Sequence, residues 1–246
     1  ICNTFTTKYP SFKYFQERNQ GLSYARNRGI KESKGNLLAF IDDYAFAKYD
    51  YVNNIHGFFN DNPQVKAIGG KIIPLYEGKE PKWMNPFLLP LVAGQDFGKT
   101  KQFKGRKFPI GANMIFQKSV FEEYGDFSVN LGRSGDTLEG GEEKDFFSRL
   151  KKNKAIIYYV HDIAVDHIIP KKRVTEDYIK RLAVGVGVSE RKRVLKNESI
   201  FAKTIEELFK IGGSIILSIY YGLTGRFSSA SMVIKFRYWV IWGLFK

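Results

Sequence analysis

The pattern of apolar and polar residues along the chain predicts an α/β protein. Five apolar residues follow one another from residue 37 to residue 41, and the run stops at Asp42 and Asp43. An unbroken run of this kind fits a strand that is buried on both faces of a parallel sheet. Because ligands of open α/β sheets bind outside the carboxyl ends of the strands, the two acids lie where a binding site is expected.

The residues before this strand predict a strand and a helix. Residues 12–18 alternate loosely between apolar and polar and fit a short strand. Ser23 is a candidate N-cap for a helix that runs to residue 34, and Gly35 stands where a left-handed residue closes a helix. The strand–helix–strand order is typical of an α/β domain.

The alternation continues after the acidic pair. The predicted elements are a helix that ends at residue 62, strands at residues 65–73, 108–117 and 155–160, and helices at residues 119–124 and 144–152. Val52, Ile55 and Phe59 fall at helical spacing in the first of these helices. The pair Gly69-Gly70 predicts a bulge or a close backbone approach within a strand.

Two long segments lack periodicity and predict loops. Residues 74–107 are irregular, and a loop of that length in a compact domain is usually functional or mobile. Residues 130–141 are polar and rich in glycine, and they lead to Glu142 and Glu143 at the start of a helix. Acids in a first helical turn are also the ordinary choice, because the helix dipole favours them there.

The last part of the chain differs in kind. A basic helix is predicted from residue 174 to about residue 196, with an interruption near Gly185 and Gly187. Residues 211–225 are almost wholly apolar but too short to span a hydrocarbon core of ~30 Å. Residues 232–245 mix aromatic and basic side chains, which suits a helix at a membrane interface, or one of two helices that close an exposed core face. We expect a domain over residues 1–198 and a helical tail over residues 199–246.

Composition restricts the partners. Lys and Arg number 39 against 25 Asp and Glu, and a net charge of +14 attracts phosphates on a nucleotide, a nucleic acid or an anionic bilayer. Cys2 is the only cysteine, so no internal disulfide forms and a reducing compartment is expected. The chain opens on Ile1 and enters mid-fold, from which we expect an N-terminal truncation.

The acidic pair permits two interpretations. Adjacent carboxylates make a hard-oxygen site that suits Mg²⁺ or Mn²⁺ carrying substrate phosphates. Alternatively, Asp42 and Asp43 only cap the next helix or solvate a turn.

Five segments, in this order, resemble a glycosyltransferase of family 2 with a GT-A fold. They are residues 19–30 (NQGLSYARNRGI), residues 40–43 (FIDD), residues 111–114 (GANM) with the segment 121–127, residues 141–145 (GEEKD) with Arg149-Leu150, and His167 with the segment 173–178. The resemblance covers residues 17–189 and implies a mostly parallel central sheet flanked by helices. It also implies that the family's first strand–helix–strand unit, which holds the nucleotide base, is missing.

The resemblance implies roles for individual side chains. Asp43 matches the metal position, Asp42 would touch ribose or metal, and His167 is a further metal or diphosphate ligand or a structural residue. Glu143 matches the catalytic base, and Glu142 caps the helix or contacts the acceptor. Four more residues have competing interpretations: Arg26 and Asn27 hold donor phosphates or fix the loop, Asn113 contacts a sugar or forms a turn, and Arg173 contacts diphosphate or belongs to a solvated basic helix. Tyr44 departs from the family pattern, which commonly has a third acid there.

The resemblance thus predicts an inverting, metal-dependent sugar transferase. Its partners would be a nucleotide-sugar donor, a glycan or lipid-linked acceptor of cell-surface polysaccharide synthesis, and the inner face of the cytoplasmic membrane as a peripheral contact. The alternative is a degenerate GT-A domain that binds sugar nucleotide without turnover. A nucleic-acid binder is disfavoured, because the basic stretch at residues 171–196 carries only Tyr178 as an aromatic for stacking.

Overall fold

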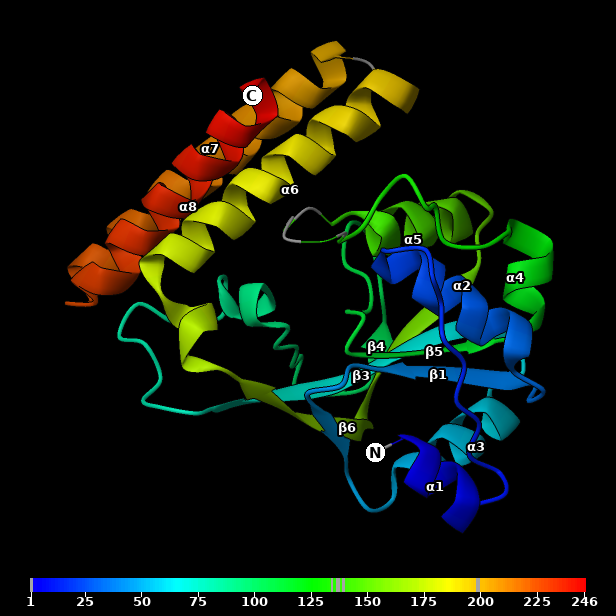
Figure 1. Ribbon diagram of the computed structural model, residues 1–246. Coiled ribbons are helices and arrows are strands. Elements are labelled where there is room, and N and C mark those ends of the chain that lie inside the picture. The colour runs from blue at the N-terminus through cyan, green and yellow to red at the C-terminus, as the bar shows by residue number, and fades with distance from the viewer. Residues whose placement is uncertain (1, 134, 136–137, 139, 198–199) are drawn as a thin grey trace.

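The computed structural model describes residues 2–133, 135, 138, 140–197 and 200–246. Its described part contains a six-stranded sheet in the order β1-β5-β3-β6-β2, with β4 beside β6 (Figure 1). The strands are β1 (Leu37–Ile41), β2 (Ala45–Ala47), β3 (Val65–Tyr76), β4 (Lys101–Gln102), β5 (Asn113–Gln117) and β6 (Ile156–Ile169).

The helices surround this sheet and extend beyond it. They are α1 (Cys2–Lys8), α2 (Leu22–Glu32), α3 (Tyr51–Asp61), α4 (Ser119–Tyr124), α5 (Glu142–Lys152), α6 (Glu176–Asn197), α7 (Ile200–Leu223) and α8 (Phe227–Phe245), with the 3₁₀ turns η1 (Leu89–Val92) and η2 (Lys171–Val174). The α/β class with C-terminal helices is therefore confirmed.

The prediction of a mostly parallel sheet is wrong, since the sheet is mixed. Among the strands of the described residues, β3 and β6 alone pair in parallel, whereas β1–β5, β5–β3, β2–β6 and β4–β6 are antiparallel. An apolar run reports the burial of a strand and not its direction. In β1 the prediction of burial on both faces is also wrong, because β1 lies at one end of the sheet order and Ala39 and Ile41 are exposed.

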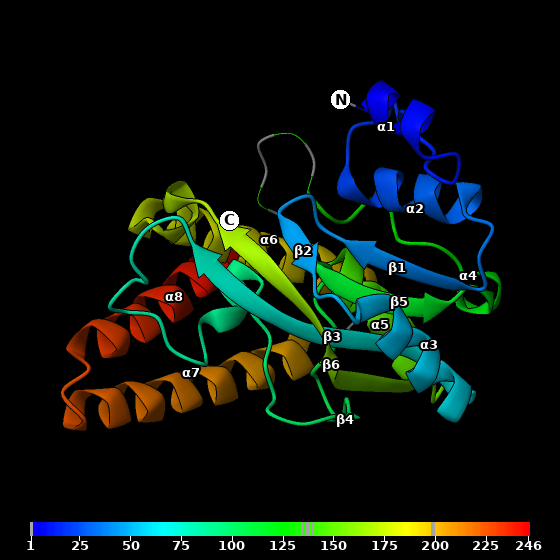
Figure 2. The same cartoon turned by 90° about the horizontal axis from the view of Figure 1, so that it is seen from below.

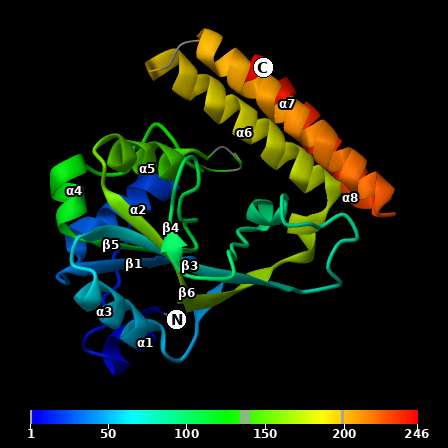
Figure 3. The ribbon, with the colours of Figure 1, turned by 180° about the vertical axis from the view of Figure 1, so that it is seen from behind.

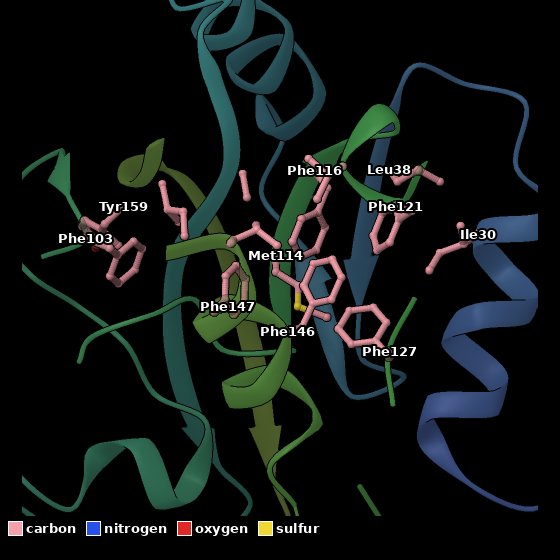
Figure 4. Packing of buried hydrophobic residues seen from close by; sticks show 14 residues of the cluster. Ile30, Leu38, Phe103, Met114, Phe116, Phe121, Phe127, Phe146, Phe147 and Tyr159 are labelled. Carbon is pink, nitrogen blue, oxygen red and sulfur yellow. The ribbon is translucent and has the colours of Figure 1, made fainter. Parts of the chain in front are cut away.

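One face of the sheet carries an aromatic core. Helices α2, α4 and α5 cover this face, and Phe116 of β5 lies among Phe121, Phe127, Phe146 and Phe147 (Figure 4). The Phe127 and Phe146 rings are the closest pair, with centroids 4.7 Å apart. The core thereby ties the start of α5 to the sheet.

Helix α3 covers the opposite face, on the side of the sheet away from α5 (Figure 2). Its buried stripe is Tyr51, Ile55 and Phe59, while Val52 is 62% exposed. The predicted stripe was therefore right at two positions and wrong at Val52. Tyr51 was missed because Tyr51 (four residues before Ile55) and Val52 (three residues before it) both fall at helical spacing, and spacing alone does not choose between them.

Three helices at the C-terminus form a separate layer (Figure 3). Helix α6 is continuous, so the predicted interruption near Gly185 and Gly187 is wrong. Gly187 instead allows α8 to approach, because a Cβ there would lie 2.2 Å from the Val240 carbonyl oxygen. Gly243 of α8 meets the Val184 backbone of α6 in the same way.

The layer shares a core with the long loop before β4. Met84 and Leu88 from that loop pack with Ile179 of α6 and with Met232 and Trp239 of α8. Within the described ranges, no helix combines the length and apolarity that crossing a membrane requires. The predicted domain boundary at residues 198–199 lies outside the described residues and stays a prediction.

The structure differs from several local predictions and confirms one. Residues 12–18 are irregular rather than a strand, and Ser23 is not the N-cap of α2, because it lies in the first turn and donates to the Leu131 carbonyl oxygen at 2.9 Å. Strand β6 continues past residue 160 and carries His167 within it. The close approach predicted at Gly70 is confirmed, since a Cβ there would lie 1.9 Å from the Ile163 carbonyl oxygen.

Candidate active site

One buried arginine joins two helices at the candidate site. Arg26 of α2 donates from Nη1 to Glu142 Oε1 at 2.9 Å and from Nη2 to Glu143 Oε1 at 2.8 Å. Only 6% of the Arg26 side chain is exposed. Charge-assisted hydrogen bonds of this length are stronger than neutral ones and fix the two carboxylates at the start of α5.

The neighbouring residues hold this arginine in place. The guanidinium lies over the Phe127 ring at 5.4 Å from its centroid. Asn27 donates from Nδ2 to the Phe127 carbonyl oxygen at 2.9 Å and accepts from the Phe127 N–H at 3.0 Å. Of the two interpretations of Asn27, the geometry supports the one in which it fixes the loop.

A glycine makes room for the pair. A Cβ atom at Gly111 would lie 2.0 Å from Glu143 Oε1 and 2.2 Å from Arg26 Nη2. Any side chain there displaces one of the two charged groups. The sequence analysis quoted residues 111–114 for the resemblance but assigned Gly111 no role, because nothing in the sequence shows what faces a glycine.

The electrostatic surroundings of Glu143 suit a base. Burial raises the pKa of its carboxyl above the ordinary value, the Arg26 guanidinium opposes that rise, and Glu142 adds to it. The side chain nevertheless keeps 21% of its surface exposed. A carboxylate whose pKa is raised binds a proton more strongly than an ordinary one, and solvent access lets the proton leave afterwards.

These groups line a cavity of about 230 Å³. Asp42, Arg26, Glu142 and Glu143 form its charged wall, together with Arg133. The rest of the lining includes an apolar wall, formed by residues 90–93, Ile110, Leu182 and Val186. Asp42 and Glu143 therefore share one cavity although they are distant in sequence, and the apolar wall was missed because residues 74–107 show no periodicity.

Asp42 and Asp43 form an acidic turn between the end of β1 and the start of β2. Asp42 Oδ2 lies 3.8 Å from Nε2 of His167, which is paired with Ala45 across the β2–β6 ladder. The His167 side chain is almost fully buried, and neither ring nitrogen has a hydrogen-bond partner among the described residues. Burial lowers the pKa of His167, and Asp42 opposes this effect.

The predicted metal ligands are only partly assembled. Among the described residues, no group of three or more His, Cys, Asp or Glu side chains is placed to hold a metal ion. Asp43 is exposed, and it is not among the described residues that line the cavity. Its charge still acts on His167, so it lies near the imidazole.

Two predicted substrate contacts are placed differently. Asn113 is fully buried, accepts from the Tyr51 hydroxyl at 2.8 Å and donates to the carbonyl oxygens of Lys71 and Ile163, both at 3.0 Å. Its amide therefore joins strands to α3, and a sugar contact stays a prediction. Arg173 lies over the Tyr44 ring at 5.0 Å from the centroid, beside the acidic turn.

The sequence of residues 1–125 matches the profile of the family described as glycosyl transferase family 2. The chain belongs to glycosyl transferase family 2. This family 2 chain is similar to the glucosyl-dolichyl phosphate glucuronosyltransferase of Haloferax volcanii, with 26% identity over 176 residues, which are 71% of the chain and 56% of the relative. It thus spans little more than half the length of that curated relative.

Two solved structures resemble this family 2 chain. The mannosyltransferase PcManGT from Pyrobaculum calidifontis, in complex with GDP-Man and Mn²⁺, superposes with a TM-score of 0.57 at 13% identity, over 98% of this chain and 73% of that one. GalNAc-T7 with UDP, GalNAc and Mn²⁺ gives 0.51 at 15% identity, over 76% and 38%. These likenesses establish the GT-A fold.

Proposed function

We propose that this chain is the catalytic part of an inverting glycosyltransferase that uses a nucleotide-diphosphate sugar. The observation that carries the proposal is the cavity in which Asp42 and the Arg26-bound Glu142 and Glu143 meet. Two of the solved structures that resemble the chain hold UDP or GDP-Man together with Mn²⁺, which supports a donor of this class.

Glu143 is the proposed base. It takes the proton of the acceptor hydroxyl as that oxygen bonds to the anomeric carbon, while the bond from this carbon to the diphosphate breaks on the opposite face. The sugar is thereby transferred with inversion. Positioned proton transfer of this kind contributes about 10²–10⁴ in rate. Arg26 keeps Glu143 aimed into the cavity, and Glu142 shares the same guanidinium and contacts the acceptor.

We assign the divalent ion, Mg²⁺ or Mn²⁺, to Asp43, Asp42 and His167. The fit rests on the imidazole of His167, whose two buried nitrogens have no hydrogen-bond partner in the described part of the chain, and on the carboxylate 3.8 Å away. Carboxylates and a neutral imidazole suit Mn²⁺, and the donor diphosphate supplies further oxygens. When bound, the ion neutralises charge on the leaving diphosphate.

The donor contacts of this proposal come from the rim of the cavity. Arg173, which lies beside the acidic turn, contacts the diphosphate, and Asp42 contacts the ribose or the ion. Arg26 donates one N–H from each terminal nitrogen to Glu142 and Glu143, and it acts on the donor through the field of its charge.

The acceptor is proposed to be a glycan or a lipid-linked glycan at a membrane surface, here the inner face of the cytoplasmic membrane. Exposed apolar residues form one stripe along α7, namely Ile205, Leu208, Phe209, Ile216, Ile219, Tyr220 and Leu223, and a second along α8, namely Phe227, Ile234, Tyr238, Trp242 and Phe245. Lys210 and Arg226 bound the apolar run at residues 211–225, which contains the C-terminal part of the α7 stripe. Apolar stripes beside basic residues suit peripheral binding to an anionic bilayer. The name of the Haloferax relative, which includes a dolichyl phosphate, supports a lipid-linked acceptor.

The alternative is a domain that binds sugar nucleotide without turnover. Its motivation is Tyr44, which stands where the resemblance leads one to expect a third acid. The Arg173 guanidinium lies over the Tyr44 ring, and a phenol at this position offers no carboxylate for a metal ion.

The deciding experiment is a screen of nucleotide sugars for metal-dependent diphosphate release by the full-length protein. We expect Glu143→Gln to lower turnover by about 10²–10⁴ while donor affinity, measured by calorimetry, is kept. Glu122→Gln, an exposed acid on α4, is the matched control and should change neither quantity. Equal turnover in both variants would exclude Glu143 as the base, and donor binding without turnover in the wild type would favour the alternative.

A further inference from the structure

A second cavity, of about 400 Å³, lies along α5. Its walls come from the loop at residues 105–108, from α5, and from α6 and α7. Helix α5 and the C-terminal helices lie on the same side of the sheet (Figures 1 and 3). The described lining shares no residue with the active-site cavity, so this is a separate site.

The lining of this second cavity is strongly basic. It contains one carboxylate, Glu206, and five cations, which are Arg106, Lys144, Lys151, Lys152 and Arg193. Glu206 lies 3.3 Å from Arg106, and the adjacent Glu190 pairs with Lys144 and Arg193. In the described part of the chain, no carboxylate pairs with Lys151 or Lys152. The cavity therefore carries an excess of positive charge at the C-terminal end of α5.

Two backbone carbonyl groups fix the position of the Lys151 ammonium group in this cavity. This group donates to the carbonyl oxygens of Gly105 and Lys107, which leaves one of its three protons for a further acceptor. Burial lowers the pKa of this amine, so an anion beside it would relieve the cost of the buried charge. Ser148, one turn earlier on the same helix, lines the cavity with a hydroxyl donor.

The floor of the cavity is apolar. Phe147 is fully buried, and its ring stacks on that of Phe108 with centroids 5.9 Å apart. Attraction between charges is stronger over a floor of low dielectric constant than in open water. A concave, basic surface with an apolar floor favours the binding of small anions that carry several oxygens.

We propose that this second cavity binds a phosphate or phosphodiester group through Lys151, Lys152 and Ser148, with Arg106 at the rim. The proposal does not depend on the transferase activity. The group comes either from a soluble phosphate compound or from the headgroup of an anionic lipid, since α7 contributes both to the cavity and to the exposed apolar stripe.

The test uses the full chain in EDTA, with pyrophosphate binding measured by calorimetry and vesicle binding measured by co-sedimentation. The vesicles are phosphatidylcholine with and without phosphatidylglycerol. The variants are Lys152→Gln, which changes an exposed side chain and leaves the carbonyl contacts of Lys151 intact, and the double variant Lys151→Gln/Lys152→Gln. Lys99→Gln removes the same charge from an exposed loop, and Arg133→Gln changes the active-site cavity.

We expect the double variant to weaken binding at least about tenfold and Lys152→Gln to weaken it about threefold, with Lys99→Gln and Arg133→Gln unchanged. A loss confined to the pyrophosphate arm identifies a soluble phosphate, and a loss that includes the anionic vesicles identifies a headgroup. Either result supports the site. Equal binding by all variants in both arms, or a loss only in Arg133→Gln, would overturn it.

Discussion

A Cβ atom at Gly111 would lie 2.0 Å from Oε1 of Glu143. The loop before β5 therefore packs against the Glu143 side chain with no room for a side chain at residue 111. The position of the proposed base thus depends on a residue that has no side chain. Two segments that are distant in sequence must keep this contact for the Arg26 pair to form.

Gly111→Ala should therefore lower sugar transfer by about 10²-fold, since a misplacement of about 1 Å at a catalytic group has that effect. The measurement is the rate of diphosphate release with a saturating donor. Gly29→Ala is the control, because that glycine lies in α2 with open space around its Cβ position. A Gly111→Ala enzyme as active as Gly29→Ala would contradict the assignment.

The activity should fall as the pH is lowered through a pKa above the ordinary glutamate value of about 4.3. The base works only when ionised, and burial raises the pKa of Glu143. Arg26→Gln removes the cation that opposes this rise, so the acidic limb of the pH–rate profile should move to higher pH. Arg26→Lys keeps a charge and should move it less. An unmoved limb in Arg26→Gln would show that another group titrates.

Mn²⁺ together with a nucleotide diphosphate should raise the melting temperature of the protein, and EDTA should abolish the rise. Asp43→Asn and His167→Gln should each weaken the dependence on Mn²⁺ at least about tenfold, because each removes a ligand of the proposed metal site. Asp61→Asn changes an exposed acid at the end of α3 and serves as the control. Retention of full Mn²⁺ dependence in both ligand variants would place the ion elsewhere.

The exposed apolar stripe of α7 should bind anionic vesicles. The triple variant Phe209→Ser/Ile216→Ser/Leu223→Ser removes three side chains that are more than two-thirds exposed, and we expect a loss of binding of more than about tenfold. Phe46→Ser, which changes an exposed side chain on β2, is the control. If the triple variant instead abolishes a dimer seen by sedimentation and leaves vesicle binding unchanged, the stripe is a protein interface.

Phe146→Ala should lower the free energy of unfolding by about 3–5 kcal/mol, measured by urea denaturation. Its ring is fully buried among Phe116, Phe121 and Phe127. Phe209→Ala removes the same ring from a site that is 78% exposed and should stay within about 0.5 kcal/mol of the wild type. Similar losses in the two variants would mean that the aromatic cluster is not the centre of the fold.

The sequence was sufficient for the elements with strong periodicity and for the charged wall of the site. Helices α3, α4 and α5 and strand β3 lie where their patterns predict them, and Asp42, Arg26, Glu142 and Glu143 converge on one cavity. The direction of the strands could not be read, because burial and direction are independent. The length of β6 was underestimated, because Asp162, Asp166 and His167 interrupt its apolar pattern.

Other features depend on contacts that no local pattern encodes. The clearance at Gly111, the hydrogen bonds of Asn113 and the apolar wall at residues 90–93 each require partners from remote segments. Gly185 and Gly187 were interpreted as helix breakers, whereas the helix continues through both and Gly187 admits the backbone of α8.

Helix α6 serves two neighbours at once. Leu182 and Val186 form part of the apolar wall of the active-site cavity, while Gly187 and Val184 receive α8 with no intervening side chain. Backbone atoms in contact cannot rearrange as side chains can. We therefore expect α6 to move together with α8 when the C-terminal helices tilt. If the C-terminal helices bind a bilayer as proposed, Leu182 and Val186 move with them, and lipid composition should then change the shape of the active-site cavity.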